Sequence, residues 1–160
     1  MVLARLLQLA AIGKQDKVLE IGCATGYATA ILAKLAASVV AVENDRGLAA
    51  AARANLAALG LGNVQLQEAP LDNGWRAGAP YDVILVNGGV AEIPPTISDQ
   101  LAEGGRLVTV TEGNTVGPSE ARCGSAVLMT RAEGKLSRRP AFDATVQVLP
   151  GFARRPAFVF

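Results

Sequence analysis

The sequence has 160 residues, of which 51% are hydrophobic and 18% are charged, and its 15 basic side chains nearly balance 14 acidic ones. A chain of this length is the usual size of one domain, so we expect a single domain over residues 1–160. The near-neutral charge excludes the basic surface of a nucleic-acid-binding protein, and the absence of histidine excludes His–Ser–Asp catalysis and most zinc sites. We therefore expect neither a nucleic-acid partner nor a bound metal.

Apolar periodicity predicts helices and strands in alternation over the first two thirds of the chain. In chain order, we expect a helix over 1–12, a strand over 17–22, a helix over 27–35, a strand over 38–43, a helix over 47–59, strands over 64–67 and 81–86, a short helix over 95–101 and a strand over 105–110. Most of these strands are continuously apolar, which is typical of strands buried on both faces of a parallel sheet. The pattern predicts an α/β fold, a Rossmann-like, doubly wound and mostly parallel seven-stranded sheet with helices on both faces.

The alternation of helices and strands ends after Thr111. Residues 113–124 are polar and contain glycine, so we predict a loop there. Residues 125–131 and 142–149 are predicted to finish the sheet as an antiparallel pair of strands. The basic residues 135–140 between them are predicted to form the solvated tip of this hairpin.

The apolar start of the chain bears on localisation. Arg5 and Gln8 interrupt it and no cleavage-like site follows, which argues against a signal peptide. No stretch approaches the 18 uninterrupted apolar residues of a membrane span. Cys23 and Cys123 form no CxxC pair and are expected to be free thiols in a reducing compartment. We therefore expect a cytoplasmic protein without a membrane partner.

The most informative stretch, Glu-Ile-Gly-Cys-Ala-Thr-Gly-Tyr over 20–27, joins the first strand to the next helix. The small residues Gly22, Ala24 and Gly26 let the backbone approach a ligand closely. The helix N-terminus beyond them offers free N–H groups and a partial positive charge to an anionic group such as an amino-acid carboxylate. Glu20, just before the turn, is placed to receive the ammonium group of the same ligand, directly or through water.

A second acid, Glu43, ends the next strand. In doubly wound sheets an acid at this place accepts hydrogen bonds from the hydroxyls of a ribose. The dinucleotide fingerprint GxGxxG requires a third glycine where this sequence has Tyr27, and its middle glycine is Ala24 here. The spacing therefore favours an adenosylmethionine loop over a nicotinamide dinucleotide loop.

Two further segments narrow the family: Ala-Glu-Ile-Pro over 91–94 and Gln-Leu-Ala-Glu-Gly-Gly-Arg-Leu-Val over 100–108. With the glycine loop, they make residues 1–110 resemble the protein-L-isoaspartate (D-aspartate) O-methyltransferase family of class I methyltransferases. The resemblance implies transfer of a methyl group from S-adenosyl-L-methionine, leaving S-adenosyl-L-homocysteine. The acceptor would be the carboxylate of an isoaspartyl residue in a damaged protein or peptide, so that the activity serves protein repair.

The resemblance also implies site residues. It assigns the cofactor to Glu20, Gly22, Cys23, Ala24, Gly26, Tyr27, Glu43, Asn44, Glu68, Ala69, Pro70 and Asn87. It assigns the substrate to Asn87, Gly88, Gly89, Glu92, Ile93 and Pro94. No catalytic acid or base is assigned, because an aspartyl carboxylate with a pKa of about 4 is already ionised and needs only to be positioned and desolvated.

Some residues outside these motifs have predicted roles. Asp82, at the entrance of the fourth strand, is predicted to cap or face solvent, and Trp75 is predicted to pack. Thr109, Thr111 and Asn114 are predicted to border the same ligand crevice as Asn87.

The sequence departs from the family in two places. Ala69-Pro70-Leu71 stands where family members often have an acid-bearing Gly-Asp-Gly, so adenine would rely on Glu68, backbone carbonyls or apolar contacts. Family members also carry a substantial segment, which helps form the substrate pocket, before the helix that begins here at Met1. A fragment, a misassigned start and a short form are open interpretations. Open functional alternatives are a small-molecule methyltransferase, a non-catalytic binding module and, disfavoured by Tyr27, a nicotinamide-dependent oxidoreductase.

Overall fold

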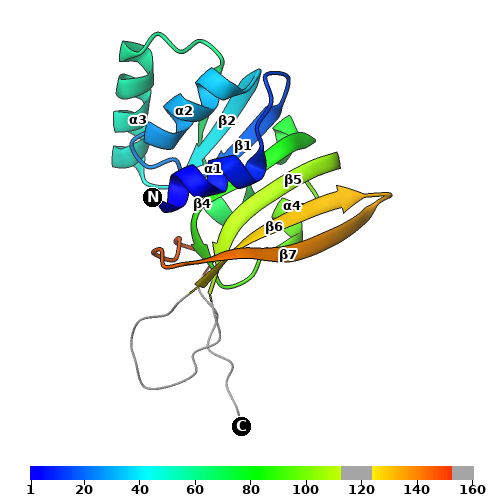
Figure 1. Cartoon of the computed structure of the whole chain (residues 1–160). Helices are drawn as coiled ribbons and strands as arrows, with labels where there is room; N and C mark the ends of the chain where they lie inside the picture. Colours follow the sequence, from blue (N-terminus) through cyan, green and yellow to red (C-terminus); the bar gives the residue numbers. More distant parts are fainter. Residues whose placement is uncertain (113–123, 153–160) are drawn as a thin grey trace, which may run out of the picture.

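The computed structural model describes residues 1–112 and 124–152, which form one sheet flanked by helices (Figure 1). The strands are β1 (Lys17–Ile21), β2 (Ser38–Glu43), β3 (Val64–Glu68), β4 (Tyr81–Val90), β5 (Leu101–Thr111), β6 (Gly124–Ala132) and β7 (Lys135–Ala144). The helices are α1 (Val2–Ala10), α2 (Tyr27–Leu35), α3 (Arg46–Ala58) and α4 (Pro95–Ser98), with single 3-10 turns at Leu71–Asn73 and Arg76–Gly78.

The seven strands lie in the order β3-β2-β1-β4-β5-β6-β7. Strands β1 to β5 pair in parallel, and β6 and β7 pair antiparallel at one edge. The order reverses at β1 and β4, where the chain passes from one side of the sheet to the other. In such sheets the crevice for a ligand opens at the carboxyl ends of the strands beside this reversal.

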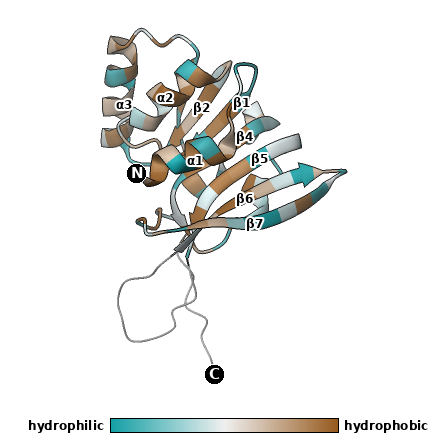
Figure 2. Ribbon diagram, in the orientation of Figure 1, coloured by the Kyte–Doolittle hydropathy of each residue, from teal (hydrophilic) through white to brown (hydrophobic). Residues whose placement is uncertain are grey.

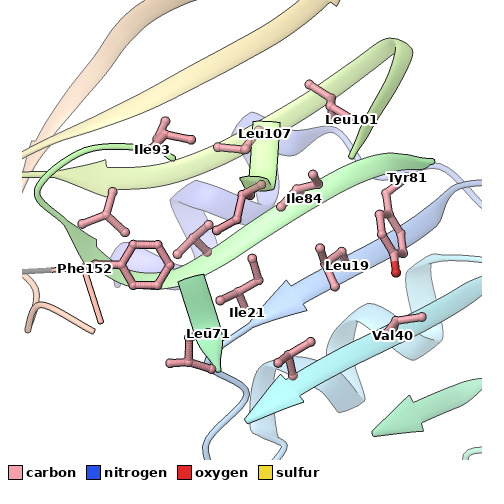
Figure 3. Close-up of a cluster of buried hydrophobic side chains, with 14 of the residues drawn as sticks. Leu19, Ile21, Val40, Leu71, Tyr81, Ile84, Ile93, Leu101, Leu107 and Phe152 are labelled. Atoms are coloured by element: carbon pink, nitrogen blue, oxygen red, sulfur yellow. The ribbon is translucent and has the colours of Figure 1, made fainter. Parts of the chain in front are cut away.

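The core has a layer on each face of the sheet. Helices α1 and α2 pack on one face through Leu6, Ala10 and Leu32, and α3 extends this layer with Ala52 and Leu56. On the other face, α4 and the 3-10 turns cover a second buried cluster. Figure 3 shows that cluster, with Phe152 from the end of the described chain beside strand residues. The helices therefore lie on both faces, as the apolar strands predicted.

The hairpin of β6 and β7 corrects the prediction for the C-terminal strands. The predicted antiparallel pair of strands at the C-terminal end of the sheet is confirmed. The second of them, β7, spans Lys135–Ala144, so its predicted bounds of 142–149 and the hairpin tip predicted over 135–140 are wrong. The actual turn is Glu133-Gly134, whose φ angles of 52° and 72° suit a tight two-residue hairpin. Residues 135–141 are exposed and include Lys135, Arg138 and Arg139, and Figure 2 shows hydrophilic stretches along this outer strand. Charged side chains on an edge strand discourage pairing with other chains.

Smaller differences affect β4, β5 and α4. Strand β4 continues past a register irregularity between Leu85 and Gly89, so it ends at Val90 and not at residue 86. Strand β5 begins at Leu101, which pairs with Tyr81, and α4 is correspondingly limited to Pro95–Ser98. The irregular end of β4 lies at the carboxyl edge of the sheet, where the ligand crevice is expected.

Candidate functional site

A pocket of about 850 Å³ opens at the carboxyl ends of β1, β2 and β4. Its walls come from α1, the loop after β1, the turn after β2 with the start of α3, the first 3-10 turn, the end of β4 and the segment after β7. They comprise Met1, Val2, Leu3, Leu6, Gly22, Ala24, Glu43, Asn44, Asp45, Leu48, Leu71, Asn87, Gly88, Val146, Gln147, Val148, Leu149 and Pro150. The volume falls within the range of about 300–1,000 Å³ that is usual for small-molecule and cofactor sites.

The glycine loop, residues 22–26, forms one wall through a left-handed backbone. Gly22, Ala24 and Gly26 have φ angles of 81°, 47° and 87°. A Cβ added to Gly26 would lie only 3.3 Å from Leu56 and 3.4 Å from Ala52, so glycine here lets α3 pack against the loop. The backbone is thus bent tightly between β1 and α2, which begins immediately after Gly26.

Glu43 holds this loop from the neighbouring strand. Its carboxylate accepts hydrogen bonds from the backbone N–H groups of Ala24 at 2.8 Å, Asn44 at 2.9 Å and Asp45 at 3.1 Å. The side chain is buried, and yet it lines the pocket. An ionised carboxylate offers about four acceptor positions, so three backbone donors leave room for one further donor from a ligand.

Glu20 is fully buried behind the pocket wall. Its Oε2 accepts from the Thr29 hydroxyl at 2.6 Å, and its Oε1 accepts from the Asn87 amide at 3.2 Å. Burial raises the pKa of Glu20 to about 7, with the nearby charge of Glu43 adding to the rise and the two hydrogen bonds opposing it. Asn87 lines the pocket and Glu20 does not.

The predicted cofactor residues fall into two groups. The pocket is lined by Gly22, Ala24, Glu43, Asn44 and Asn87. The pocket lining does not include Glu20, Cys23, Gly26, Tyr27, Glu68, Ala69 and Pro70.

Three of the predicted cofactor residues that do not line the pocket have well-defined environments elsewhere. Cys23 is buried, and its pKa is raised to about 12 by burial and by the charges of Glu20 and Glu43, so the thiol stays protonated at neutral pH. Tyr27 is exposed and lines a separate hollow between α2 and α3. Glu68 forms an exposed ion pair with Arg53 at 2.5 Å.

Among the predicted substrate residues, Asn87 and Gly88 line the pocket, whereas Gly89, Glu92, Ile93 and Pro94 do not. Gly89 instead pairs with the segment after β7, donating to Gln147 O at 2.8 Å and accepting from Leu149 N at 2.9 Å. Ile93 packs in the core, and Pro94 precedes α4.

The sequence interpretation missed the wall made by residues 146–152, which we call the crossing segment. Its Leu149 lies over two glycines of the pocket: a Cβ added to Gly22 would be 3.1 Å from a δ-carbon of Leu149, and one added to Gly88 would be 2.5 Å from its γ-carbon. Phe152 anchors the end of the segment in the core and accepts a hydrogen bond from Ala91 N at 3.1 Å. The available signal is the set of apolar residues Val146, Val148 and Leu149, which the sequence pattern predicts as the end of a strand.

Asp82 and Trp75 have the roles predicted for them, whereas Thr109 and Thr111 are not among the residues that line the pocket. Asp82 caps the start of β1 by accepting from Lys17 N at 2.8 Å, and Trp75 packs against the core. Thr109 donates to Gly88 O at 3.2 Å, directly behind the pocket, whereas Thr111 bonds to Ser125 O in the neighbouring strand.

Within residues 1–112 and 124–152, no group of three or more Cys, Asp or Glu side chains is arranged to hold a metal ion. No helix in the same ranges has the length and apolar character needed to cross a bilayer. Asn114 and Cys123 lie outside them.

Comparison with known protein sequences identifies relatives. The family model for Protein-L-isoaspartate(D-aspartate) O-methyltransferase matches residues 1–119. Protein-L-isoaspartate O-methyltransferase 1 of Rhodopseudomonas palustris (strain HaA2) is 44% identical over 107 residues, which cover 67% of this chain and 44% of the relative. The protein-L-isoaspartate O-methyltransferase of Methanoculleus marisnigri is 41% identical over 129 residues, or 81% of this chain and 56% of the relative. The chain thus spans about half the length of these relatives.

Solved structures agree with the sequence matches. A protein-L-isoaspartate O-methyltransferase structure has a TM-score of 0.82 at 29% identity, covering 94% of this chain and 47% of its own. A Plasmodium falciparum structure in complex with S-adenosyl-L-homocysteine shares the fold, with a TM-score of 0.73 at 20% identity over 92% of this chain and 70% of its own. The predicted Rossmann-like methyltransferase fold is therefore confirmed, and the match over residues 1–119 shows that this chain belongs to the protein-L-isoaspartate(D-aspartate) O-methyltransferase family.

Proposed function

We propose that the pocket binds S-adenosyl-L-methionine and that the chain contributes the cofactor half of a methyltransferase acting on isoaspartyl carboxylates of proteins. The observation that carries this proposal is the Glu43 carboxylate, held by three backbone N–H groups at the end of β2 beside the left-handed glycine loop. This arrangement suits a ligand that combines a ribose with an amino-acid group. The family match over residues 1–119 supports the same proposal.

The residues present fit the cofactor. The free acceptor position of Glu43 would take a ribose hydroxyl, and the backbone of Gly22 and Ala24 would lie along the methionine part. Leu48 and Leu71 offer apolar surface for adenine, since Glu68 is engaged with Arg53 and the matching stretch Ala69-Pro70 carries no carboxylate. When bound, the cofactor supplies an electrophilic methyl group on a sulfonium.

The chain's own residues would act by position and not by proton transfer. An isoaspartyl carboxylate is ionised at neutral pH, so it requires no general base. Asn87 and Gly88, at the irregular end of β4, would border the reacting methyl group. The apolar side chains of Leu3, Leu6 and Leu149 would exclude water from the site, which strengthens the electrostatic contacts within it.

Calorimetric titration of the 160-residue chain with S-adenosyl-L-homocysteine tests cofactor binding. We expect micromolar binding, and at least a hundredfold loss in Glu43→Ala, because three backbone donors lose their charged acceptor and the loop loses its shape. Glu68→Ala is the matched control. It removes an acid from the end of the adjacent strand, but that acid is exposed and paired on the surface, so affinity should stay within about twofold.

Transfer of a labelled methyl group tests the acceptor. We expect labelling of a peptide that contains isoaspartate and none of its aspartyl isomer. Equal labelling of both peptides would contradict the repair function, and turnover of small acceptors alone would favour a small-molecule methyltransferase. A folded chain that binds no S-adenosyl-L-homocysteine would contradict the cofactor site itself.

A further inference from the structure

The buried Glu20 carboxyl can reach the pocket only through another side chain. One of its oxygens accepts from Thr29 and the other from Asn87, and its exposed fraction is 0%. Asn87 lines the pocket, whereas Glu20 does not. Glu20 is therefore not positioned to bind a ligand's ammonium group directly, and Asn87 is the side chain that links it to the pocket by a hydrogen bond.

The hydrogen bond between the two side chains determines which end of the Asn87 amide faces Glu20 and which end is left for a ligand. An asparagine amide has a donor NH₂ end and an acceptor oxygen, and an ionised carboxylate can only accept. Glu20 therefore holds the Nδ2 end at 3.2 Å. The Oδ1 end accepts no hydrogen bond from the residues that the structure describes, and it remains available on the side chain that faces the pocket.

We infer that Glu20 is a positioning residue that orients the Asn87 amide so that its oxygen, and not its NH₂ group, is offered to the cationic ammonium group of the cofactor. The inference rests on the proposed function, because it concerns the same pocket. An amide oxygen attracts an ammonium group and accepts a hydrogen bond from one of its N–H groups, whereas an NH₂ group in the same place would repel it. The buried carboxyl thus selects for a cationic ligand without touching it.

The protonation state of Glu20 controls this orientation. A protonated carboxyl can donate to Asn87 Oδ1, which allows the amide to turn and to present its NH₂ group to the pocket. Burial raises the pKa of Glu20 to about 7, close to neutral pH. Among the described residues, the titratable groups that face Glu20 are Glu43 from β2, whose charge favours the protonated form, and the neutral Cys23 thiol of the glycine loop. Thr29 from α2 and Asn87 from β4 are its polar contacts.

The test is the pH dependence of two ligands on the whole chain. Affinity for S-adenosyl-L-homocysteine, which carries the ammonium group, should rise about tenfold between pH 6 and pH 8, as expected for a hydrogen bond to a charged group. Adenosine, which lacks the amino-acid part, should bind equally at both pH values. The pH dependence should disappear in Asn87→Ala and in Glu20→Gln, whose side chain does not titrate.

Thr29→Val serves as a matched variant that leaves Asn87 intact. The Thr29 hydroxyl stabilises the ionised form of Glu20, so its loss should raise the pKa of Glu20 and move the midpoint of the affinity change to higher pH. A purely structural role of Glu20 would change affinity without moving that midpoint. The direction of the shift therefore separates positioning from packing.

The outcomes distinguish this inference from the proposed function. If adenosine binds and S-adenosyl-L-homocysteine binds with no pH dependence, or if Asn87→Ala keeps the dependence, the positioning role is wrong and the cofactor site stands. If neither ligand binds a folded chain at either pH, the proposed function fails and the inference fails with it.

Discussion

The glycine loop and the crossing segment face the same pocket, but different forces hold them. The loop is shaped by its own left-handed residues and by backbone hydrogen bonds to Glu43. The crossing segment is held by two hydrogen bonds to Gly89, by Leu149 against Gly22 and Gly88, and by the buried ring of Phe152. One wall is therefore built from polar contacts near in sequence or on adjacent strands. The other is built from backbone hydrogen bonds and apolar packing between residues far apart in sequence.

The comparison explains why one wall was predicted and the other was not. A bend that needs small residues leaves its mark in the local sequence, as Gly22, Ala24 and Gly26 do. A mostly apolar segment such as residues 146–149 fits a strand or a packed extended segment equally well, because both conformations bury the same side chains. Changes in pH and single substitutions should affect the free energy of unfolding differently in the two walls.

The largest expected effect is on the pH dependence of stability through Glu20, next to the loop. Its folded-state pKa of about 7 lies above the ordinary value of 4.5, so the folded state binds the proton more tightly than the unfolded state. The associated stabilisation is present below the ordinary pKa and is lost as pH rises through the folded pKa. The free energy of unfolding should therefore fall by about 3 kcal/mol between these two values.

Urea denaturation at a series of pH values measures this contribution as the difference between the parent chain and Glu20→Gln. The variant keeps the size of the side chain and cannot titrate, so its stability should lack the fall. Identical pH profiles for the two chains would mean that Glu20 has an ordinary pKa. The crossing segment carries no such group, and Leu149→Ala should leave the profile unchanged in shape.

The next effect concerns the crossing segment and its two glycines. In Gly88→Ala the new Cβ would lie 2.5 Å from the γ-carbon of Leu149, so the segment must move, and we expect a loss of about 2 kcal/mol in unfolding free energy. Leu149→Ala alone should cost about 1–2 kcal/mol through lost packing.

Thermal or urea unfolding of the double variant tests the contact between these residues. Because the smaller side chain makes room for the added methyl group, the double variant should cost less than the sum of the single variants by about 1–2 kcal/mol. Strict additivity would show that Leu149 does not lie over Gly88 in solution.

The smallest effect is expected within the loop. Ala24 adopts a φ of 47°, in the left-handed region that favours glycine. Ala24→Gly should raise the free energy of unfolding by about 0.5 kcal/mol, since relief of strain slightly exceeds the greater entropy of the unfolded chain. Ala30→Gly, within α2, is the control and should lower stability by about 1 kcal/mol. A destabilised Ala24→Gly variant would mean that the loop is not strained there.

The sequence by itself determined the alternation of strands and helices, the parallel sheet, the glycine loop and the acid at the end of β2. These features depend on local periodicity and on backbone geometry that only small residues allow. It also determined the family, because residues 20–27, 91–94 and 100–108 carry the resemblance that the family match confirms.

Only the tertiary structure decided how the C-terminal part and the buried acid are used. The exposed, basic strand β7 has the composition of a turn, and its pairing with β6 makes it a strand. The crossing segment becomes a pocket wall because Leu149 lies over Gly22 and Gly88. Both glycines precede Leu149 by more than 60 residues in the sequence. Glu20 is separated from the pocket by Asn87, a side chain 67 residues later. Such roles depend on which distant groups meet when the chain packs, and no local pattern records that.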